Sequence, residues 1–413
     1  MSSYMNRNPT GKNQHGPLPT ADDPQLQALL QRLHREQKTD SQIAETVMIE
    51  LGRSTIKRWR GSLTLLKSRK VAKTTHLQLL EQAILNQMES DPSGRHGVRS
   101  IWSRLAFEEN LHVPRRIVAE VMHVHAPEGF EYRAPEGRNP TRTEKFPLGP
   151  HERWSCDGHD KLNKIGCSIY GIVDDATSRY LGIWVVPSNR EGTVVAYLYL
   201  SLVLSYGGIP IQNASDCGSE TTQMAGLQMA LRDEYSLQEH NVPAHSYVTS
   251  THNIAVERGW RRIREHWGDN AFLRFNEGIS EGLYNPDDPL QHNLSRWLWS
   301  FVFQQGLDKA VAFLNAKKMR LDRDKPGPSG ISRDDAFRYP SRWGGRDDLL
   351  IQVDCDVVSA MRDEIYEEGL LSFVDSDFAM RAHNALKRLN LTLEQVTVEN
   401  AWVVFTQLLP LMK

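Results

Sequence analysis

The stretch TSTHNIAVERGWRRIREHW, residues 249–267, places one acid, Glu257, directly ahead of several arginines. In a helix, residues three and four apart share a face. That face would carry, in order, Asn253, Glu257, Arg261 and Arg264. One explanation is an exposed helix with salt bridges along its surface. The other is a metal-binding acid beside the positive charge that a phosphate backbone requires, and this explanation needs further acids upstream.

Two upstream acids lie in short apolar segments. Asp157 lies in WSCDGH, and Asp216 ends IPIQNASD. Side chains at strand ends lie where ligands approach a sheet, and three carboxylates that converge there repel one another unless a divalent cation neutralises them. Such donors suit Mg²⁺ or Mn²⁺, and two ions about 3.5–4 Å apart support in-line phosphoryl transfer. Taken singly, each acid also has a structural explanation: a strand-end hydrogen bond, a turn or a salt bridge.

Around these acids the pattern alternates between strands and helices. Runs rich in β-branched and aromatic residues predict strands at 153–160, 166–175, 179–187, 209–216 and 245–249. DDATS, residues 174–178, suits a hairpin turn, so Asp174 and Asp175 are expected to be structural. Helices are predicted at 191–206, 220–235 and over the opening stretch. Hairpin-linked strands followed by strand and helix alternation predict a mixed α/β sheet.

The segment 23–70 predicts a helix-turn-helix module. Thr39 or Asp40 can cap a helix over SQIAETV. The turn LGRST follows, and Ser54 or Thr55 can cap a second helix over IKRWRGSL. Two short helices joined by a glycine-containing turn are typical of this module.

The charge of this segment indicates a nucleic-acid partner. Residues 51–73 hold eight Lys or Arg and no Asp or Glu, with Trp59 among them. An unopposed basic block of this kind is expected of a surface that contacts phosphates, and a solvated basic face is the structural alternative. We therefore expect Lys57, Arg58 and Arg60 of the second helix to contact DNA.

The rest of the chain completes a modular organisation. GRHGVRSIWSRLAFEENLHVPRRIVAEVM again predicts helix, turn and helix, with the turn at Val113 and Pro114. His123 and His125 alternate on a strand-like or loop segment without nearby acids, so we do not expect zinc there. The predicted parts are a disordered start (1–22), a helix-turn-helix module (23–70), a second helical, helix-turn-helix-like module (74–125), a proline-rich linker (126–150), a catalytic core (150–275) and a helical C-terminal region (280–413).

Bulk composition excludes several classes of protein. The chain of 413 residues is 39% hydrophobic and 24% charged, ordinary values for a soluble globular protein of two or three domains. The polar start lacks a secretory signal, and the longest apolar run is too short to cross a bilayer. Four widely spaced cysteines argue against a disulfide framework and fit a reducing compartment. Trp297 and Trp299 are interpreted as core residues.

Four segments, in order, resemble the signatures of the DDE integrases and transposases: WSCDGHDKL, GIVDDATSRY, NASDCGSET and STHNIAVERGWRRIR. The resemblance covers about residues 148–270. In that family an Asp on the first strand, an Asp after the fourth strand and a Glu in an N-x-x-x-E helix bind two metal ions on an RNase H-like fold. The corresponding residues here are Asp157, Asp216 and Glu257, with Asn253 as the motif asparagine and with Arg261 and Arg264 where the family places basic residues that contact DNA.

The resemblance implies a fold and a function. The expected fold is an α/β RNase H-like core, a mixed five-stranded sheet flanked by helices, with N-terminal helix-turn-helix modules and a mainly helical C-terminal region. Among members of that family, the sequence most resembles integrase-core proteins of fungal and animal genomes. It departs from retroviral integrases in that we expect no His/Cys zinc module before the core and no small β-barrel after it. The expected activity is cleavage and transfer of DNA strands with two Mg²⁺ or Mn²⁺ ions. His159 and Asp160, which follow Asp157, are further candidates for contact with metal-bound water.

The implied partners are DNA, as element ends and target duplex, and further copies of the chain in a homo-oligomer; no membrane partner is expected. One alternative is a domesticated, non-catalytic DNA-binding protein that keeps the fold. Another is a nuclease acting on RNA–DNA hybrids, although helix-turn-helix modules favour duplex DNA. The expected location is the nucleus in a eukaryotic host, where KSRKVAK would serve import, or the cytoplasm in a bacterium.

Overall fold

The chain divides into two compact units. Unit 1 comprises Met1–Glu89 and Gly97–Tyr132, and unit 2 comprises Ser90–His96 and Arg133–Lys413. The computed structural model describes residues 23–47, 53–91, 94–127, 130, 146–160, 166–238, 240–248, 253–347 and 349–412. Most of the predicted linker (126–150) and the predicted disordered start (1–22) lie outside these residues.

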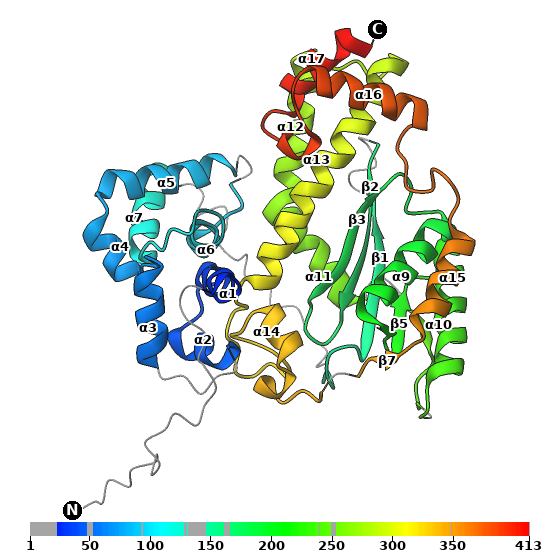
Figure 1. Cartoon of the computed structure of the whole chain (residues 1–413), viewed down its shortest axis with the longest axis horizontal. Helices are drawn as coiled ribbons and strands as arrows, with labels where there is room; N and C mark the ends of the chain where they lie inside the picture. Colours follow the sequence, from blue (N-terminus) through cyan, green and yellow to red (C-terminus); the bar gives the residue numbers. More distant parts are fainter. Residues whose placement is uncertain are drawn as a thin grey trace, which may run out of the picture. The chain divides into compact units, whose positions relative to one another are not determined.

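Unit 1 begins with three helices (Figure 1), which surround one apolar cluster. They are α1 (Pro24–Arg35), α2 (Asp40–Thr46) and α3 (Arg53–Ser62). Thr39 caps α2 in a capping box with Gln42, so Thr39, and not Asp40, is the cap of this helix. The cap predicted at Ser54 or Thr55 for the next helix is wrong, because α3 already begins at Arg53. Ser54 and Thr55 lie inside its first turn. The cluster consists of Leu26, Leu30, Leu33, Ile43, Ile56, Trp59 and Leu65.

The remaining helices of unit 1 surround a second apolar cluster. They are α4 (Ser68–Thr74), α5 (Leu77–Glu89), α6 (Val98–Glu109) and α7 (Arg115–His125). α7 begins directly after Pro114, as predicted. His123 and His125 lie in the last turn of α7, which corrects their placement on a strand or loop. Apolar residues at helical spacing in α7, Val118, Val121 and Met122, face this cluster.

Unit 2 is built on a mixed five-stranded sheet, which confirms the predicted α/β core. Its order is β3-β2-β1-β5-β6, in which β1 pairs antiparallel with β2 and parallel with β5. The strands are β1 (Arg153–His159), β2 (Ser168–Asp174), β3 (Tyr180–Val186), β5 (Gln212–Ser215) and β6 (His245–Tyr247). The turn after β2 is held by Asp174, which is fully buried and accepts hydrogen bonds from the backbone of His151 and Thr177. Asp174 is therefore structural, as predicted.

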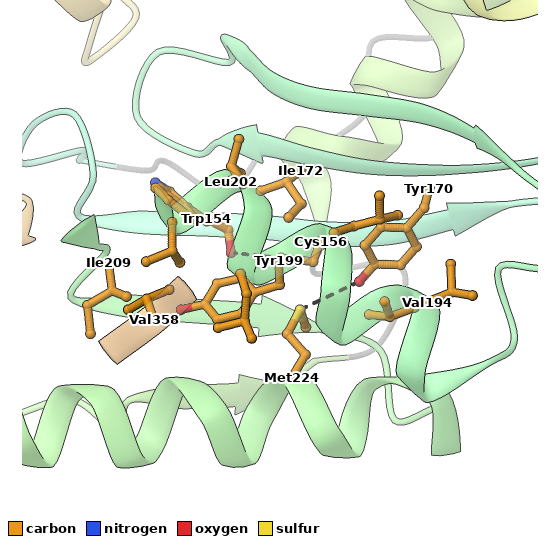
Figure 2. Packing of buried hydrophobic residues seen from close by; sticks show 14 of the residues in the cluster. Trp154, Cys156, Tyr170, Ile172, Val194, Tyr199, Leu202, Ile209, Met224 and Val358 are labelled. Carbon is orange, nitrogen blue, oxygen red and sulfur yellow. Dashed lines mark hydrogen bonds between the residues drawn. The ribbon is translucent and has the colours of Figure 1, made fainter. Parts of the chain in front are cut away.

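Helices cover both faces of this sheet (Figure 1). α9 (Gly192–Tyr206), α10 (Thr222–Tyr235) and α15 (Cys355–Ile365) belong to one face. Alternate residues of β1 and β2, among them Trp154, Cys156 and Ile172, pack there against α9 (Figure 2). α9 ends at Gly207 with a φ of 70°, a left-handed cap that suits glycine. The opposite face receives α11 (Ile254–Ile263) and α13 (Pro289–Ala316).

The predicted strand 209–216 is two strands. β4 (Gly208–Ile209) leaves the main sheet and pairs with β7 (Ile351–Gln352), while β5 carries the part that joins β1. Pro210 lies between the two and has no N–H for a ladder. The partner β7 lies far downstream, which explains why local pattern alone did not reveal the break.

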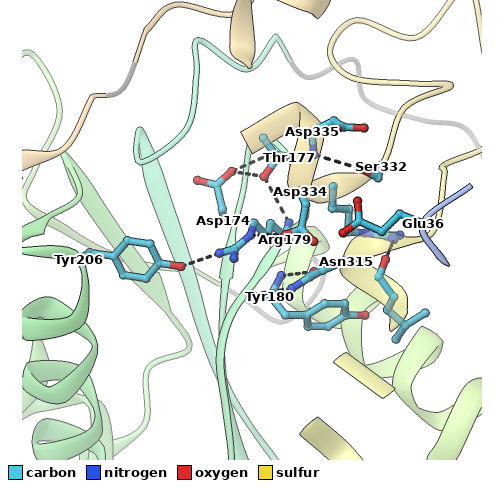
Figure 3. A network of polar contacts seen from close by, with 12 residues as sticks. Glu36, Asp174, Thr177, Arg179, Tyr180, Tyr206, Asn315, Ser332, Asp334 and Asp335 are labelled. Atoms are coloured by element: carbon cyan, nitrogen blue, oxygen red, sulfur yellow. Dashed lines mark hydrogen bonds and ion pairs between the residues drawn. The ribbon is translucent and has the colours of Figure 1, made fainter. Parts of the chain in front are cut away.

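The edge strand β3 is covered by side-chain amides of α13. Asn315 accepts from the backbone N–H of Tyr180 at 3.0 Å and donates to its carbonyl at 3.0 Å (Figure 3). Gln304 accepts from Val185 N–H at 2.7 Å and donates to the carbonyl of Ile183 at 3.2 Å. These amides satisfy backbone groups that an edge strand otherwise exposes.

The C-terminal region is helical, as predicted. After α11 come a π-helical turn, η4 (Arg264–Gly268), and α12 (Asp269–Ser280). Beyond α13 follow α14 (Arg333–Arg338), α16 (Ser376–Arg388) and α17 (Ala401–Met412). Trp297 and Trp299 are buried, which confirms their interpretation as core residues. Trp299 packs with Phe275 and Trp402 in an aromatic cluster. Among the described residues, none of the helices is long and apolar enough to cross a membrane.

Candidate active site

Asp157 and Asp216 lie at the same end of neighbouring parallel strands. The register pairs Ser155 of β1 with Ala214 of β5. Asp157 and Asp216 each follow two residues later, so they belong to the same face of the sheet. Asp216 directly follows the last residue of β5, Ser215. The sheet therefore brings together two acids that are far apart in the chain.

Asn253 fixes the start of the helix that carries Glu257. Asn253 is the N-cap residue of α11 and is 2% exposed. Its side-chain amide donates to the backbone carbonyl of Cys156 at 3.1 Å, directly beside Asp157. Glu257 lies one turn further along α11, on its exposed side. The motif asparagine thus fastens this helix to β1 at the level of the first acid.

The pKa of Asp157 is affected by the two other acids. Its pKa is raised from 3.8 to about 7, first because burial disfavours the charged carboxylate and then because of the negative charges of Glu257 and Asp216. A hydrogen bond from the Trp260 indole to Asp157 opposes this rise in pKa. Both other acids are therefore close enough to act on Asp157, and they act in the direction that favours a bound cation or a proton.

The donor set suits a hard divalent ion. Carboxylate oxygens are the ligands that Mg²⁺ and Mn²⁺ prefer, and the mutual repulsion at Asp157 is what such an ion would relieve. Within the described part of the chain, however, no three His, Cys, Asp or Glu side chains stand close enough to share one ion.

Basic residues continue along α11 beyond Glu257. Arg261 has 73% of its side chain exposed and bonds to Glu265 at 2.8 Å. Arg264, 37% exposed, lies 4.0 Å from Asp269. The exposed i, i+4 pair of Arg261 and Glu265 contributes little to stability, so the Arg261 guanidinium can exchange its carboxylate partner for a phosphate at small cost.

The helix α3, whose cations are predicted to contact DNA, carries both exposed and buried cationic side chains. Lys57 and Arg58 are exposed, whereas Arg60 is 5% exposed. The Arg60 guanidinium donates to Asp40 at 2.7 Å and bonds to His34 at 3.0 Å. Arg60 is thus used inside unit 1, and the prediction that it contacts DNA loses its physical basis. Lys57 and Arg58 keep theirs.

The residues after Asp157 have other partners. Asp160 accepts from Asn189 at 2.8 Å and from Arg190 at 2.9 Å. These bonds, the Arg190 bond foremost, lower the pKa of Asp160. His159 stacks on Trp260, with ring centroids 4.9 Å apart. Contact of either residue with metal-bound water stays a prediction.

Sequence reasoning missed Trp260 and Gly171. The Trp260 indole donates to Asp157 at 2.7 Å, and Gly171 pairs with Asp157 across β1 and β2. A signal for Trp260 was present, since it lies three residues after Glu257 and so belongs near the same helix face. Gly171 gave no signal, because only the register of the hairpin places it opposite the acid.

A mixed sheet with helices on both faces, an acid in its first strand and a second acid after the neighbouring parallel strand define an RNase H-like α/β core. Comparison with known families gives the same class. Residues 147–333 match the family model described as integrase core domain. This part of the chain is therefore similar to an integrase core domain.

Other comparisons add little. One similar solved structure is described as "CryoEM structure of simian T-cell lymphotropic virus intasome in complex with PP2A regulatory subunit B56 gamma", with 14% sequence identity over 59% of this chain and 71% of that chain. The TM-score is 0.31, too low to support an argument about fold or function. Among curated proteins no match was found.

Proposed function

We propose that this protein is an integrase-type polynucleotidyl transferase that cleaves and joins DNA strands with a divalent metal. The observation that carries the proposal is the arrangement of acids around Asp157: Asp216 follows the neighbouring parallel strand, Asn253 ties α11 beside Asp157, and the charges of Asp216 and Glu257 both raise the pKa of Asp157. The integrase core domain at residues 147–333 supports the same function.

Each group has a role in this proposal. Asp157, Asp216 and Glu257 would hold two Mg²⁺ or Mn²⁺ ions through carboxylate oxygens. Bound ions of this kind activate an attacking hydroxyl and stabilise the departing oxygen of a phosphodiester. Asn253 sets the position of Glu257 by fixing the first turn of α11. Arg261, exposed on α11, and Arg264, half-buried at the start of η4, would hold the phosphates on either side of the reacting one.

Unit 1 would supply affinity for duplex DNA. Lys57 and Arg58 stand exposed on α3, while Ile56 and Trp59 of the same helix are buried in the apolar cluster. This division leaves a basic face outward, as a helix that lies against a phosphate backbone requires. Joining two DNA ends needs two catalytic sites, so we also propose that the active form is a homo-oligomer.

The test is a nicking and strand-transfer assay on supercoiled and linear duplex DNA with Mg²⁺ or Mn²⁺. We expect Asp157→Asn and Glu257→Gln each to reduce the rate at least ~100-fold, because each removes a charged ligand of the ions. Asp160→Asn is the matched control: it removes an acid of the same segment whose oxygens are taken by Asn189 and Arg190. It should retain the wild-type rate.

Two results would contradict the proposal. Equal, weak activity of wild type and both acid variants would leave the non-catalytic DNA-binding protein as the explanation. Cleavage of RNA–DNA hybrids in preference to duplex DNA would favour the nuclease instead.

A further inference from the structure

Trp260 gives its hydrogen bond to the first acid. Its indole N–H donates to Oδ2 of Asp157 at 2.7 Å, and Trp260 is only 4% exposed. Elsewhere in the chain the indoles of Trp102, Trp343 and Trp402 donate to backbone carbonyl oxygens. An indole nitrogen is a donor only and does not titrate. The donor of this contact is therefore the same at every pH at which the protein is folded.

A glycine opposite Asp157, Gly171, leaves space for the indole of Trp260. Gly171 pairs with Asp157 in the β1–β2 ladder. A Cβ on Gly171 would lie 2.5 Å from Cη2 of Trp260 and 2.7 Å from Cδ1 of Ile183, closer than two carbon atoms can approach. On β1, His159 stacks on the indole with 14° between the ring planes. Glycine below and imidazole beside it thus form a slot that fits the Trp260 ring.

Pairing of buried indoles is not a general need of this fold. Within the described residues, the indole nitrogens of Trp267 and Trp299 are buried and have no hydrogen-bond partner. The bond from Trp260 to Asp157 is therefore better explained by what it does to the carboxylate than by satisfaction of the indole. It fixes one oxygen and thereby the rotation of the carboxyl group.

We infer that Trp260 is a positioning residue that orients the Asp157 carboxylate for metal binding, and that Gly171 is required because the indole occupies the space of its side chain. The inference rests on the proposed function, since it concerns the same carboxylate. It adds two residues to the site, both of which would act through Asp157 and not as ligands of the ion. A hydrogen bond to a metal-binding carboxylate commonly changes metal affinity about 10- to 100-fold when it is lost.

The direct experiment measures Mn²⁺ binding to the full-length chain, by the electron paramagnetic resonance signal of free Mn²⁺. Trp260→Phe keeps an aromatic ring beside His159 and removes the N–H donor. We expect affinity for Mn²⁺ to fall at least ~10-fold. Trp184→Phe is the control, because Trp184 lies on β3, away from Asp157, and this variant should bind Mn²⁺ like wild type.

A second pair of variants adds one methyl group at a glycine of the sheet. Gly171→Ala should displace the indole and reproduce the loss of Mn²⁺ affinity, and the double variant with Trp260→Phe should be no worse than either single one. Gly182→Ala is matched to it: a Cβ there would lie 2.1 Å from Cη2 of Trp184, a similar clash in the same sheet. It should leave Mn²⁺ affinity unchanged.

A third variant protects the test against misfolding. Replacement of Trp260 by 3-benzothienylalanine keeps the ring shape and substitutes sulfur for the N–H. Loss of Mn²⁺ affinity in this folded protein supports the inference. Wild-type affinity in this protein, with loss in Asp157→Asn, would overturn the role of Trp260 and leave the proposed function intact. Wild-type affinity in Asp157→Asn and Glu257→Gln as well would overturn the proposed function itself.

Discussion

His34 and His112 stack inside unit 1, with ring centroids 3.8 Å apart and 16° between the planes. Burial, aided by neighbouring cationic groups, lowers the pKa of His34 from 6.5 to about 3 and that of His112 to about 4. The unfolded chain takes up these protons near pH 6.5, well before the folded chain does. Between pH 6.5 and these lower values the unfolded state binds more protons, so stability falls as the pH drops.

This pair predicts acid sensitivity of unit 1. A buried imidazole such as His34 costs about 2 kcal/mol of unfolding free energy at pH 5 relative to neutral pH. His34→Asn keeps an acceptor for Arg60 but cannot titrate, so it should lose less stability between pH 7 and pH 5 than wild type. Urea unfolding at the two pH values measures this. His76→Asn, at an exposed histidine of the same unit, should behave as wild type; an unchanged pH dependence in His34→Asn would contradict the prediction.

At the level of the element, the edge strand β3 depends on α13. Asn315→Leu has nearly the same size as the native residue but leaves the N–H and carbonyl of Tyr180 without partners. We expect a loss of about 1–3 kcal/mol of unfolding free energy for each backbone group left unpaired. The exposed strand should also promote self-association. Thermal unfolding and light scattering measure the two effects.

The matched control lies on the same helix. Gln305 donates to the carbonyl of Leu393 and has no bond to the sheet. Gln305→Leu should therefore lower stability without adding self-association. If both variants aggregate to the same extent, the amides of α13 do not protect the strand.

Elements with a strong local pattern were predictable from sequence. The hairpin at Asp174 and the helix ended by Gly207 follow from residues next to them in the chain. The break at Pro210, the partner of β4 and the slot for Trp260 depend on segments brought together only by folding. Arg60 shows the same limit: composition marks it as basic, but only its contact with Asp40 reveals that it is buried.

At the level of the molecule, the formal net charge of −2 gives no overall attraction to DNA. The proposed binding would therefore come from local groups such as Lys57 and Arg58. Each phosphate contact adds about 0.9 to the slope of log affinity against log salt. The double variant Lys57→Gln, Arg58→Gln should therefore bind duplex DNA more weakly, with a slope smaller by about 2. Fluorescence anisotropy over a salt series measures this slope.

The control for this measurement is the third cation of α3. Arg60→Gln removes a buried charge that pairs with Asp40, so it should destabilise unit 1 and leave the salt slope of the folded protein unchanged. A slope reduced as much by Arg60→Gln as by the double variant would show that buried and exposed cations of α3 are not distinguished by DNA.

The amides that line β3 also restrict how copies of this protein can meet. With Tyr180 and Val185 already bonded to α13, a neighbouring chain cannot continue the sheet by adding a strand at that border. Copies that meet at this edge would have to bind one another through the shape and charge of side chains, which depend on the sequence. They could not bind through unpaired backbone N–H and carbonyl groups, which every sequence has.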